Sequence, residues 1–585
     1  MRQEQQIKHL TVWNCLLFFL VTTGFEMFAI ITANLYGATR LILVGEMLLI
    51  AFLAFLSLEI FLVFKFDPKD KKNFLTPFLL THAPWLIAPA LGALPHIHLP
   101  APHDLLLRKF QIFFGLMWVT HLFLFTRFFL DRTYKKSGEY SKIFGLAAAF
   151  LFCGTTLTTA TFCDLSGDEP HYLLMAQSLL HDGDLDLSNN YADRDYSSFY
   201  HRGELEPQGL EHVVNGKRVS HHPLGPVLLI LPGFALFGRL GAALTMALLA
   251  ALALYWTLKA LEGTGAKGWP LHVTGLIGLA SSPLFLFSGL IFPEVPTACL
   301  TALSLYLFGK KRWFGLGLAQ GLLLWMHNRN ALLVIPFLFF FIWEIWKEKK
   351  RRNDLLGRFA LGFAIPVALL ALYFYSLYGV LTPLGAHNES FTSLFRLDHF
   401  FIGFFGLIFD QECGFCFHYP VFALMVSGAA LLFRFRHPFR FPAAGTAAFY
   451  FLAMCFYENL GLTPAARYFV GITPLLLVVI YPMLEKTKVP SFGYYTTMFA
   501  FVSGVVVNWV LAVVPWMRYN KLNGENMMLK VAGDLLRIPL TAGAPSFQTP
   551  VIQWQSYAVS LFWLVLTFVL SVLFLRKQTK NSLKG

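Results

Sequence analysis

Apolar runs of about twenty residues alternate with short polar gaps along most of the chain. A helix of about twenty apolar residues spans a hydrocarbon core of about 30 Å. Only helices and closed barrels satisfy every backbone amide inside a bilayer, and barrel strands alternate in polarity over about ten residues. The runs show no such alternation. The pattern therefore predicts an all-α polytopic membrane protein with about sixteen transmembrane helices.

The apolar runs predict where the crossings lie. They fall near 11–33, 41–64, 74–94, 110–130, 143–163, 241–259, 271–289, 295–309, 313–327, 331–346, 358–378, 417–433, 443–459, 467–484, 492–514 and 555–575. The run 11–33 is too long for a signal-peptide core and lacks a small-residue cleavage site, so we expect a retained helix. The run 224–238 is short and contains Pro226 and Pro232, and we interpret it as a juxtamembrane or re-entrant segment.

One long polar segment, 164–222, interrupts the apolar pattern with 11 acidic and 4 basic residues. We expect it to be a large first outer loop. Pro170 suits a first helical position, so 170–181 is predicted to be a short amphipathic juxtamembrane helix lying in the interface. The expected organisation is extra N-terminal helices (1–142), a transmembrane core including the loop (143–484), and C-terminal helices (485–585) with an outer loop at 516–552.

The net charge of +13 accompanies a composition that is 56% hydrophobic and only 14% charged. The basic residues gather in short gaps between apolar runs: Lys69, Lys71, Lys72; Arg132, Lys135, Lys136; Lys310, Lys311, Arg312; 347–352; Arg434, Arg436, Arg440; Arg576, Lys577, Lys580. Cytoplasmic loops carry such clusters, so the charge indicates topology, with both termini inside, and no nucleic-acid partner is expected.

The seven cysteines and the loop histidines show no tight metal-ligand spacing. Cys413 and Cys416 form a CxxC pair, which fits two small interfacial residues better than a redox or metal pair because no second ligand pair is in view. His221 and His222 are adjacent, but surface or hydrogen-bonded histidines are more common than ligands. No metal site is assigned, although the acidic residues could hold a divalent metal.

The predicted topology brings polar residues from distant segments to the outer ends of the helices. These are Asp168, Glu169, Glu294, 327–330, Asp410, Glu412, Glu458 and Arg467. Asp168 and Glu169 are a carboxylate pair suited to general acid–base chemistry, although Asp168 before Pro170 also fits a helix N-cap. Glu294 lies between Pro293 and Pro296, where a solvated interhelix turn is the alternative.

Two arginines are candidate ligands for an anionic headgroup. Arg329 lies in the polar break His327-Asn328-Arg329-Asn330, and guanidinium is well suited to phosphate oxygens. The alternative is an interfacial arginine that contacts lipid nonspecifically. Arg467 precedes an apolar run, where a helix N-terminus also favours an anion; it could equally be an anchor that snorkels to the interface.

Several motifs together resemble the GT-C superfamily of membrane glycosyltransferases, in particular the branch with protein O-mannosyltransferases and the lipid A aminoarabinose transferase. They are Gly167-Asp168-Glu169-Pro170-His171-Tyr172, the run beginning Pro223-Leu-Gly-Pro226, Glu294 between two helices, the break at Arg329, Phe409-Asp410-Gln411 with Tyr419-Pro420, and Pro464-Ala-Ala-Arg467-Tyr468. The resemblance covers about 143–484. The polar break departs from the Lys-Gly type of that family, and four extra helices precede the usual first one.

The resemblance implies a GT-C-like fold and a polyprenyl-phosphate-linked sugar donor, whose sugar passes with inversion to a hydroxyl of a lipid, glycan or protein. It makes Asp168 the catalytic base with Glu169 beside it, and Arg329 and Arg467 the ligands of the donor phosphate. The substrate pocket would include His171, Tyr172, Glu294, His327, Asn328, Asn330, Asp410 and Tyr468. No cofactor is required, and no glycine-rich nucleotide motif is present.

The implied location is a multi-pass position in a bacterial inner membrane with the site facing the periplasm. A transporter or flippase of a polyprenyl-linked sugar is the first alternative, weakened because no internal repeat is seen. A non-catalytic scaffold whose outer loop binds a partner is the second.

Overall fold

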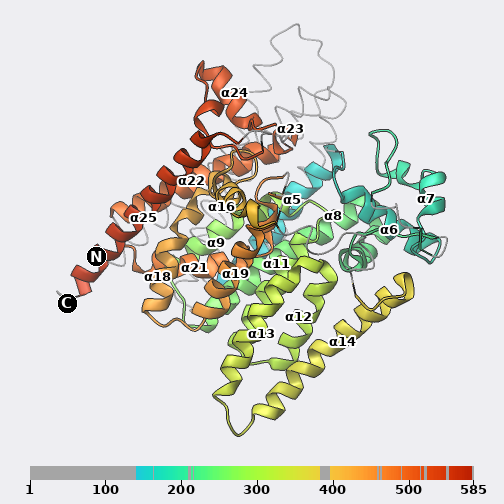
Figure 1. The fold of residues 1–585 in the computed structure, drawn as a ribbon, viewed down its shortest axis with the longest axis horizontal. Helices are drawn as coiled ribbons and strands as arrows, with labels where there is room; N and C mark the ends of the chain where they lie inside the picture. Colours follow the sequence, from blue (N-terminus) through green and yellow to red (C-terminus); the bar gives the residue numbers. More distant parts are fainter. Residues whose placement is uncertain are drawn as a thin grey trace, which may run out of the picture. The chain divides into compact units, whose positions relative to one another are not determined.

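The computed structural model describes residues 140–582 except 163, 209–212, 215–216, 383–395, 458–459, 462–463, 489–490, 514, 520–522 and 549–551. These residues belong to one compact unit, Gly138–Gly585 (Figure 1). The first four predicted crossings and Glu458 lie outside the described residues. The sheet found in the described part is a two-stranded antiparallel ribbon of β1 (Val213–Val214) and β2 (Lys217–Arg218).

Helices make up nearly all of the regular structure in the described part. In chain order they are α5 (Tyr140–Phe162), α6 (Glu169–His181), α7 (Ser188–Ala192), η2 (Asp195–Ser198), α8 (Leu224–Gly263), α9 (Trp269–Ala280), α10 (Pro283–Phe287), α11 (Glu294–Gly309), α12 (Trp313–Met326), η3 (Asn328–Asn330), α13 (Ala331–Trp346), α14 (Arg352–Tyr378), η5 (Leu397–His399), α16 (Phe400–Phe409), α17 (Phe415–His418), η6 (Pro420–Leu424), α18 (Met425–Arg434), η7 (Arg440–Gly445), α19 (Thr446–Met454), α20 (Arg467–Val470), α21 (Thr473–Lys486), α22 (Phe492–Val513), α23 (Pro515–Arg518), α24 (Met527–Leu536), η8 (Thr541–Gly543) and α25 (Trp554–Ser582).

Each predicted apolar run from 143 onward contains helical structure, although helix α19 ends at Met454, before the predicted end of the run 443–459. The run 271–289 is divided into α9 and α10, and 417–433 is divided into α17, η6 and α18. Helix α16 was not predicted, because its apolar stretch is only ten residues long and cannot cross a bilayer as a helix. The structure therefore confirms the helical class and adds short helices, among them α7, α16 and α24.

Six segments of the described part are long and apolar enough to cross a membrane. They are Leu224–Gly263, Trp269–Phe287, Asn328–Trp346, Arg352–Tyr378, Phe492–Ala512 and Trp554–Leu575. Shorter apolar helices, among them Glu294–Gly309 and Trp313–Met326, pack between them. These segments are typical of a membrane protein, and the count of about sixteen crossings stays a prediction.

Helix α8 reverses direction at Phe237–Gly238, where the backbone leaves helical geometry. A Cβ on Gly241 would overlap the carbonyl oxygen of Gly233. These two glycines would be about 12 Å apart in a straight helix, so the segments before and after the turn fold back on each other. The structure thus confirms that 224–238 is a segment separate from the predicted crossing at 241–259.

Helix α6 confirms the helix predicted at 170–181 but corrects its amphipathic character. All residues of 169–176 are buried, so its first two turns are enclosed on every side. Part of the enclosure comes from α8, against which α6 packs. Glu169 is therefore enclosed by the protein, and Asp168 directly precedes this buried turn.

Helices α12 and α14 pack against each other (Figure 1), with glycines at their contact. A Cβ on Gly362 would overlap the carbonyl oxygen of Phe314, whereas nothing lies within 4 Å of a Cβ on Gly357 of the same helix. We expect Gly362→Ala to lower the free energy of unfolding by about 1–3 kcal/mol, because the added methyl group separates two backbones. Thermal unfolding of the purified protein in detergent measures the change.

Gly357→Ala is the matched control for this crossing. Gly357 is exposed on α14, so alanine should leave stability unchanged or raise it by up to about 1 kcal/mol. Equal midpoints for the two variants would contradict the close crossing of α12 and α14.

Candidate functional site

The two acidic residues at the start of α6, Asp168 and Glu169, have different kinds of hydrogen-bond partner. Asp168 occupies the N-cap position, yet its side chain makes no capping hydrogen bond. Its Oδ2 instead accepts a hydrogen bond from Arg467 Nη2 at 2.7 Å. Glu169 is 3% exposed and accepts backbone N–H groups, from Ile291 at 3.0 Å and Ser166 at 3.3 Å. Asp168 is thus directed to another charged group, whereas Glu169 fastens the loop to the segment before α11.

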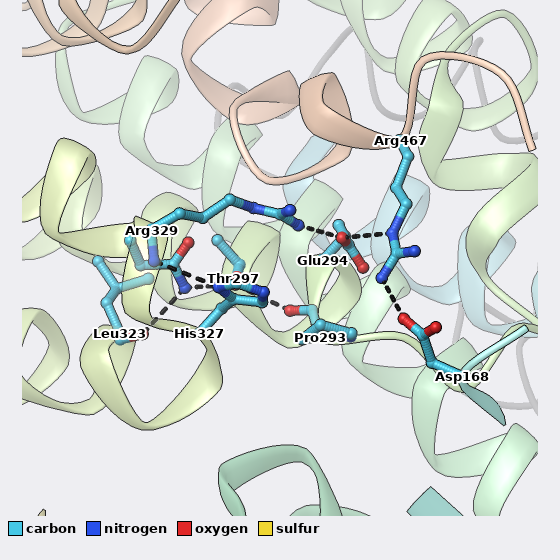
Figure 2. A network of polar contacts seen from close by, with 9 residues as sticks. Asp168, Pro293, Glu294, Thr297, Leu323, His327, Arg329 and Arg467 are labelled. Atoms are coloured by element: carbon cyan, nitrogen blue, oxygen red, sulfur yellow. Dashed lines mark hydrogen bonds and ion pairs between the residues drawn. The ribbon is translucent and has the colours of Figure 1, made fainter. Parts of the chain in front are cut away.

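Glu294, the first residue of α11, is the centre of a buried ion-pair cluster (Figure 2). One oxygen, Oε1, accepts from Arg467 Nε at 2.8 Å and from Arg329 Nη2. The carboxylate is 3% exposed, and its Oε2 is buried without a hydrogen-bond partner. The alternative of a solvated turn is therefore wrong for Glu294.

The polar break 327–330 is folded so that it presents Arg329. The backbone N–H of Arg329 donates to His327 Nδ1 at 3.2 Å, which caps the short η3 helix. The Asn330 amide donates to Thr297 Oγ1 at 2.8 Å and to the Leu323 carbonyl at 2.9 Å (Figure 2). Asn330 therefore holds η3 against α11 and α12, and this places the Arg329 guanidinium beside Glu294.

The Arg329 guanidinium also lies over the ring of Tyr468, 4.6 Å from its centroid, and that of Arg467 lies 4.5 Å from the Phe292 centroid. Aromatic faces attract cations most strongly where water is excluded. The arginine side chains are only 16% and 14% exposed. Both arginines are consequently held within the protein, and the alternatives of nonspecific lipid contact and snorkelling do not describe them.

Arg467 is positioned through a loop that Asp410 organises. Asp410 Oδ1 accepts the backbone N–H groups of Glu412 at 2.7 Å and Cys413 at 2.9 Å, and the Cys413 carbonyl accepts the N–H of Ala466 at 3.0 Å. Ala466 has φ 61°, a left-handed conformation that is uncommon for alanine. The loop thereby turns the chain sharply just before Arg467. Asp410 was predicted to be a pocket residue, but its contacts make it a support for Arg467.

A cavity of about 100 Å³ lies next to Asp168. Its polar wall contains Asp168, His221, His222, His327 and Asn328; its apolar wall includes Tyr172, Trp325 and, from α14, Leu370, Tyr373, Phe374 and Tyr378. Three of the predicted pocket residues, Tyr172, His327 and Asn328, therefore line one space with the predicted base Asp168. Glu294, Arg329 and Arg467 are outside this lining. Arg467 pairs with Asp168, and Glu294 links Arg467 to Arg329.

His171, a predicted pocket residue, is buried next to the cavity. Its Nδ1 is 2.8 Å from the Tyr191 hydroxyl, and its ring stacks on His222 with 5.3 Å between centroids. Burial lowers the pKa of His171 to about 3, so the ring is neutral at physiological pH. His171 therefore contributes packing and no charge to this region.

Asp168 is anionic over the physiological range. Burial alone would raise its pKa, but contact with His222 and the charge of Arg467 stabilise the carboxylate and hold its pKa well below the usual range. A lowered folded-state pKa stabilises the protein above the unfolded value, about 3.9, and this contribution is lost as the pH falls through the folded-state value.

We therefore expect wild type to be more stable than Asp168→Asn at pH 7, with the difference shrinking only below about pH 4. Thermal unfolding of both proteins between pH 3 and pH 7 measures this difference. The comparison isolates Asp168, since both proteins retain Glu294. A difference independent of pH down to 3, or one that shrinks near pH 6, would contradict the assigned ionisation.

The site also includes residues outside the predicted set. His222 was seen only as part of an adjacent histidine pair, and Phe292 and Thr297 gave no signal beyond their place near Glu294.

Among the described residues, no group of three or more His, Cys, Asp or Glu side chains is arranged to hold a metal. Cys413 is buried, and its Sγ accepts a hydrogen bond from the Gln548 amide at 3.4 Å. No family model matches the chain, and neither a curated protein nor a solved structure matches it.

Proposed function

We propose that this chain is a membrane glycosyltransferase of GT-C type, which moves a sugar from a polyprenyl-phosphate donor to an acceptor hydroxyl with inversion. The observation that carries the proposal is the position of Asp168. Its carboxylate lines a cavity and pairs with the buried Arg467, and Glu294 joins Arg467 to a second buried arginine, Arg329. This arrangement supports a base and a cationic group for a leaving phosphate within one site.

The cavity adjoins a helix that has the character of a membrane span. Helix α14 supplies four residues of the apolar wall, and it is long and apolar enough to cross a bilayer. Elsewhere on this helix Leu361, Leu369, Leu372 and Tyr375 are exposed. A substrate with a polyprenyl tail could therefore lie along α14 while its polar head reaches Asp168.

The residues support a single displacement. The acceptor oxygen bonds to the anomeric carbon as the bond from that carbon to the phosphate oxygen breaks. Asp168 takes the hydroxyl proton, and the polyprenyl phosphate leaves with the bonding electron pair. Arg329 and Arg467 would stabilise the growing phosphate charge, so no general acid is needed. In doing so they would share their N–H groups between the phosphate and Glu294.

A divalent metal fits this cluster poorly. Asp168 Oδ2 and Glu294 Oε1 already accept hydrogen bonds from guanidinium groups, and two cations beside them would repel a third.

The arrangement of charge supports a site on the outer face. Glu294 begins α11 and Lys310 follows its end, about 24 Å away along sixteen residues. Likewise Arg329 precedes α13, and Lys347 follows it. If the basic ends are cytoplasmic, as the positive-inside rule predicts, the cluster faces the periplasm of an inner membrane.

Sugar transfer by the full chain tests the proposal. Membranes containing the protein would be given a panel of radiolabelled polyprenyl-phosphate hexoses and pentoses, and the label would be followed into lipid, glycan and protein fractions. We expect one donor to label one fraction only when the protein is present. Movement of intact donor across sealed vesicles without transfer would contradict the proposal and favour a flippase.

A further inference from the structure

His222 is a buried histidine that faces Asp168 across part of the cavity wall. It is 5% exposed, and its Nε2 lies 4.0 Å from Asp168 Oδ1. Both residues line the same cavity. Arg467 occupies the other carboxylate oxygen, Oδ2, so Oδ1 is the oxygen on the side of His222.

The ring of His222 is fixed in orientation by its neighbours. His171 stacks on it, and Tyr172 meets it edge-on with 5.1 Å between centroids. Its Nδ1 is 2.9 Å from Ser220 Oγ, and its backbone N–H donates to the same oxygen at 3.2 Å. Ser220 is held in turn, because its carbonyl accepts from the Tyr378 hydroxyl at 3.3 Å. This leaves Nε2 as the ring nitrogen directed toward Asp168.

The hydrogen-bond pattern indicates which nitrogen carries the ring proton. Ser220 Oγ accepts the backbone N–H of His222, so its hydroxyl can donate to Nδ1. The neutral ring then carries its proton on Nε2. Nε2 becomes a donor that points to the same space as the acceptor oxygen Oδ1.

The separation of these two atoms suits a third atom between them. At 4.0 Å they are too far apart for a direct hydrogen bond. A hydroxyl oxygen placed about 2.8 Å from each can donate its proton to Oδ1 and accept from Nε2–H. Such a pairing holds a hydroxyl with its proton aimed at the base, which is the geometry that proton removal requires.

We propose that Asp168 and His222 together bind the acceptor hydroxyl, with His222 as the residue that positions its oxygen. The proposal rests on the glycosyltransferase function. It assigns His222 to the acceptor and the arginines to the donor phosphate. Loss of His222 should therefore weaken the use of acceptor and leave donor binding unchanged.

The test compares His222→Leu, His222→Gln and His201→Gln in membranes at matched expression. The probes are the radiolabelled polyprenyl-phosphate sugar that wild type uses and a lipid, glycan or protein extract as acceptor, each titrated separately. Leucine removes the donor atom, and glutamine returns an amide N–H close to the place of Nε2. His201 is exposed in the same polar segment and is the matched control.

We expect His222→Leu to raise the half-saturating amount of acceptor about tenfold, the effect of losing one hydrogen bond, with no change for the donor. His222→Gln should restore most of the loss, and His201→Gln should match wild type. Equal effects on donor and acceptor, no rescue by glutamine, or no effect at all would overturn the role of His222 while the transferase function stands. Absence of transfer by wild type with every donor would overturn both.

Discussion

Replacing Asp168 by asparagine should slow sugar transfer by at least two orders of magnitude while the donor still binds. Asparagine has the same shape, and its carbonyl oxygen can still accept from Arg467 Nη2, so the cluster keeps most of its geometry. It cannot take the hydroxyl proton. General base catalysis contributes about 10²–10⁴-fold, and we expect a loss of that size in the transfer rate. The measurement is transfer from a radiolabelled polyprenyl-phosphate sugar at matched expression, with donor binding followed by photo-crosslinking.

Two further acids provide the controls for this result. Glu204→Gln changes an exposed acid of the same polar segment and should leave transfer unchanged. Glu169→Gln should reduce stability more than turnover, because the Glu169 oxygens accept backbone N–H groups. Full activity of Asp168→Asn would show that Asp168 is not the catalytic base. A loss in Glu169→Gln equal to that in Asp168→Asn would show instead that the two acids act together.

The sequence predicted the helices well because their signal is local. A run of twenty apolar residues identifies a helix by itself. The ends of such runs indicated that Asp168, Glu294, Arg329 and Arg467 lie at the ends of different helices on the same side of the membrane. Their ion pairs join four separate segments of the described chain. The sequence therefore indicated which residues lie at the helix ends, but it did not indicate that Glu294 pairs with both arginines.

Other features depend on packing that no local pattern records. Asp410 looked like a pocket residue, yet its oxygens are used by backbone N–H groups, including that of Phe547, 137 positions later in the chain. His222 became notable only when the fold brought it to Asp168. Helix α6 appeared amphipathic because its sequence contains polar residues such as His171. These residues are buried against partners that the local sequence does not reveal.

Removing the charge of Glu294 should destabilise the protein more than any surface change. In Glu294→Gln two buried guanidiniums lose their shared counter-charge, and among the described residues only Arg467 keeps a carboxylate, that of Asp168. Breaking a buried ion pair by removing one partner costs about 3–5 kcal/mol, whereas an exposed pair contributes about 0–1 kcal/mol. Thermal unfolding in detergent measures the loss. Glu348→Gln, which breaks the exposed pair with Lys311, is the control and should change the midpoint little.

A second substitution separates loss of charge balance from loss of shape. Arg329→Met added to Glu294→Gln removes the guanidinium whose ion pair in the described part of the chain is with Glu294, and leaves an unbranched apolar side chain beside Tyr468. If repulsion between unpaired cations causes the instability, the double variant should be more stable than Glu294→Gln alone, with a coupling energy of about 1–3 kcal/mol. Strictly additive losses would mean that Glu294 stabilises the site through packing. Because the same arginines are assigned to the donor phosphate, high concentrations of polyprenyl phosphate should partly restore the single variant and fail to restore the double.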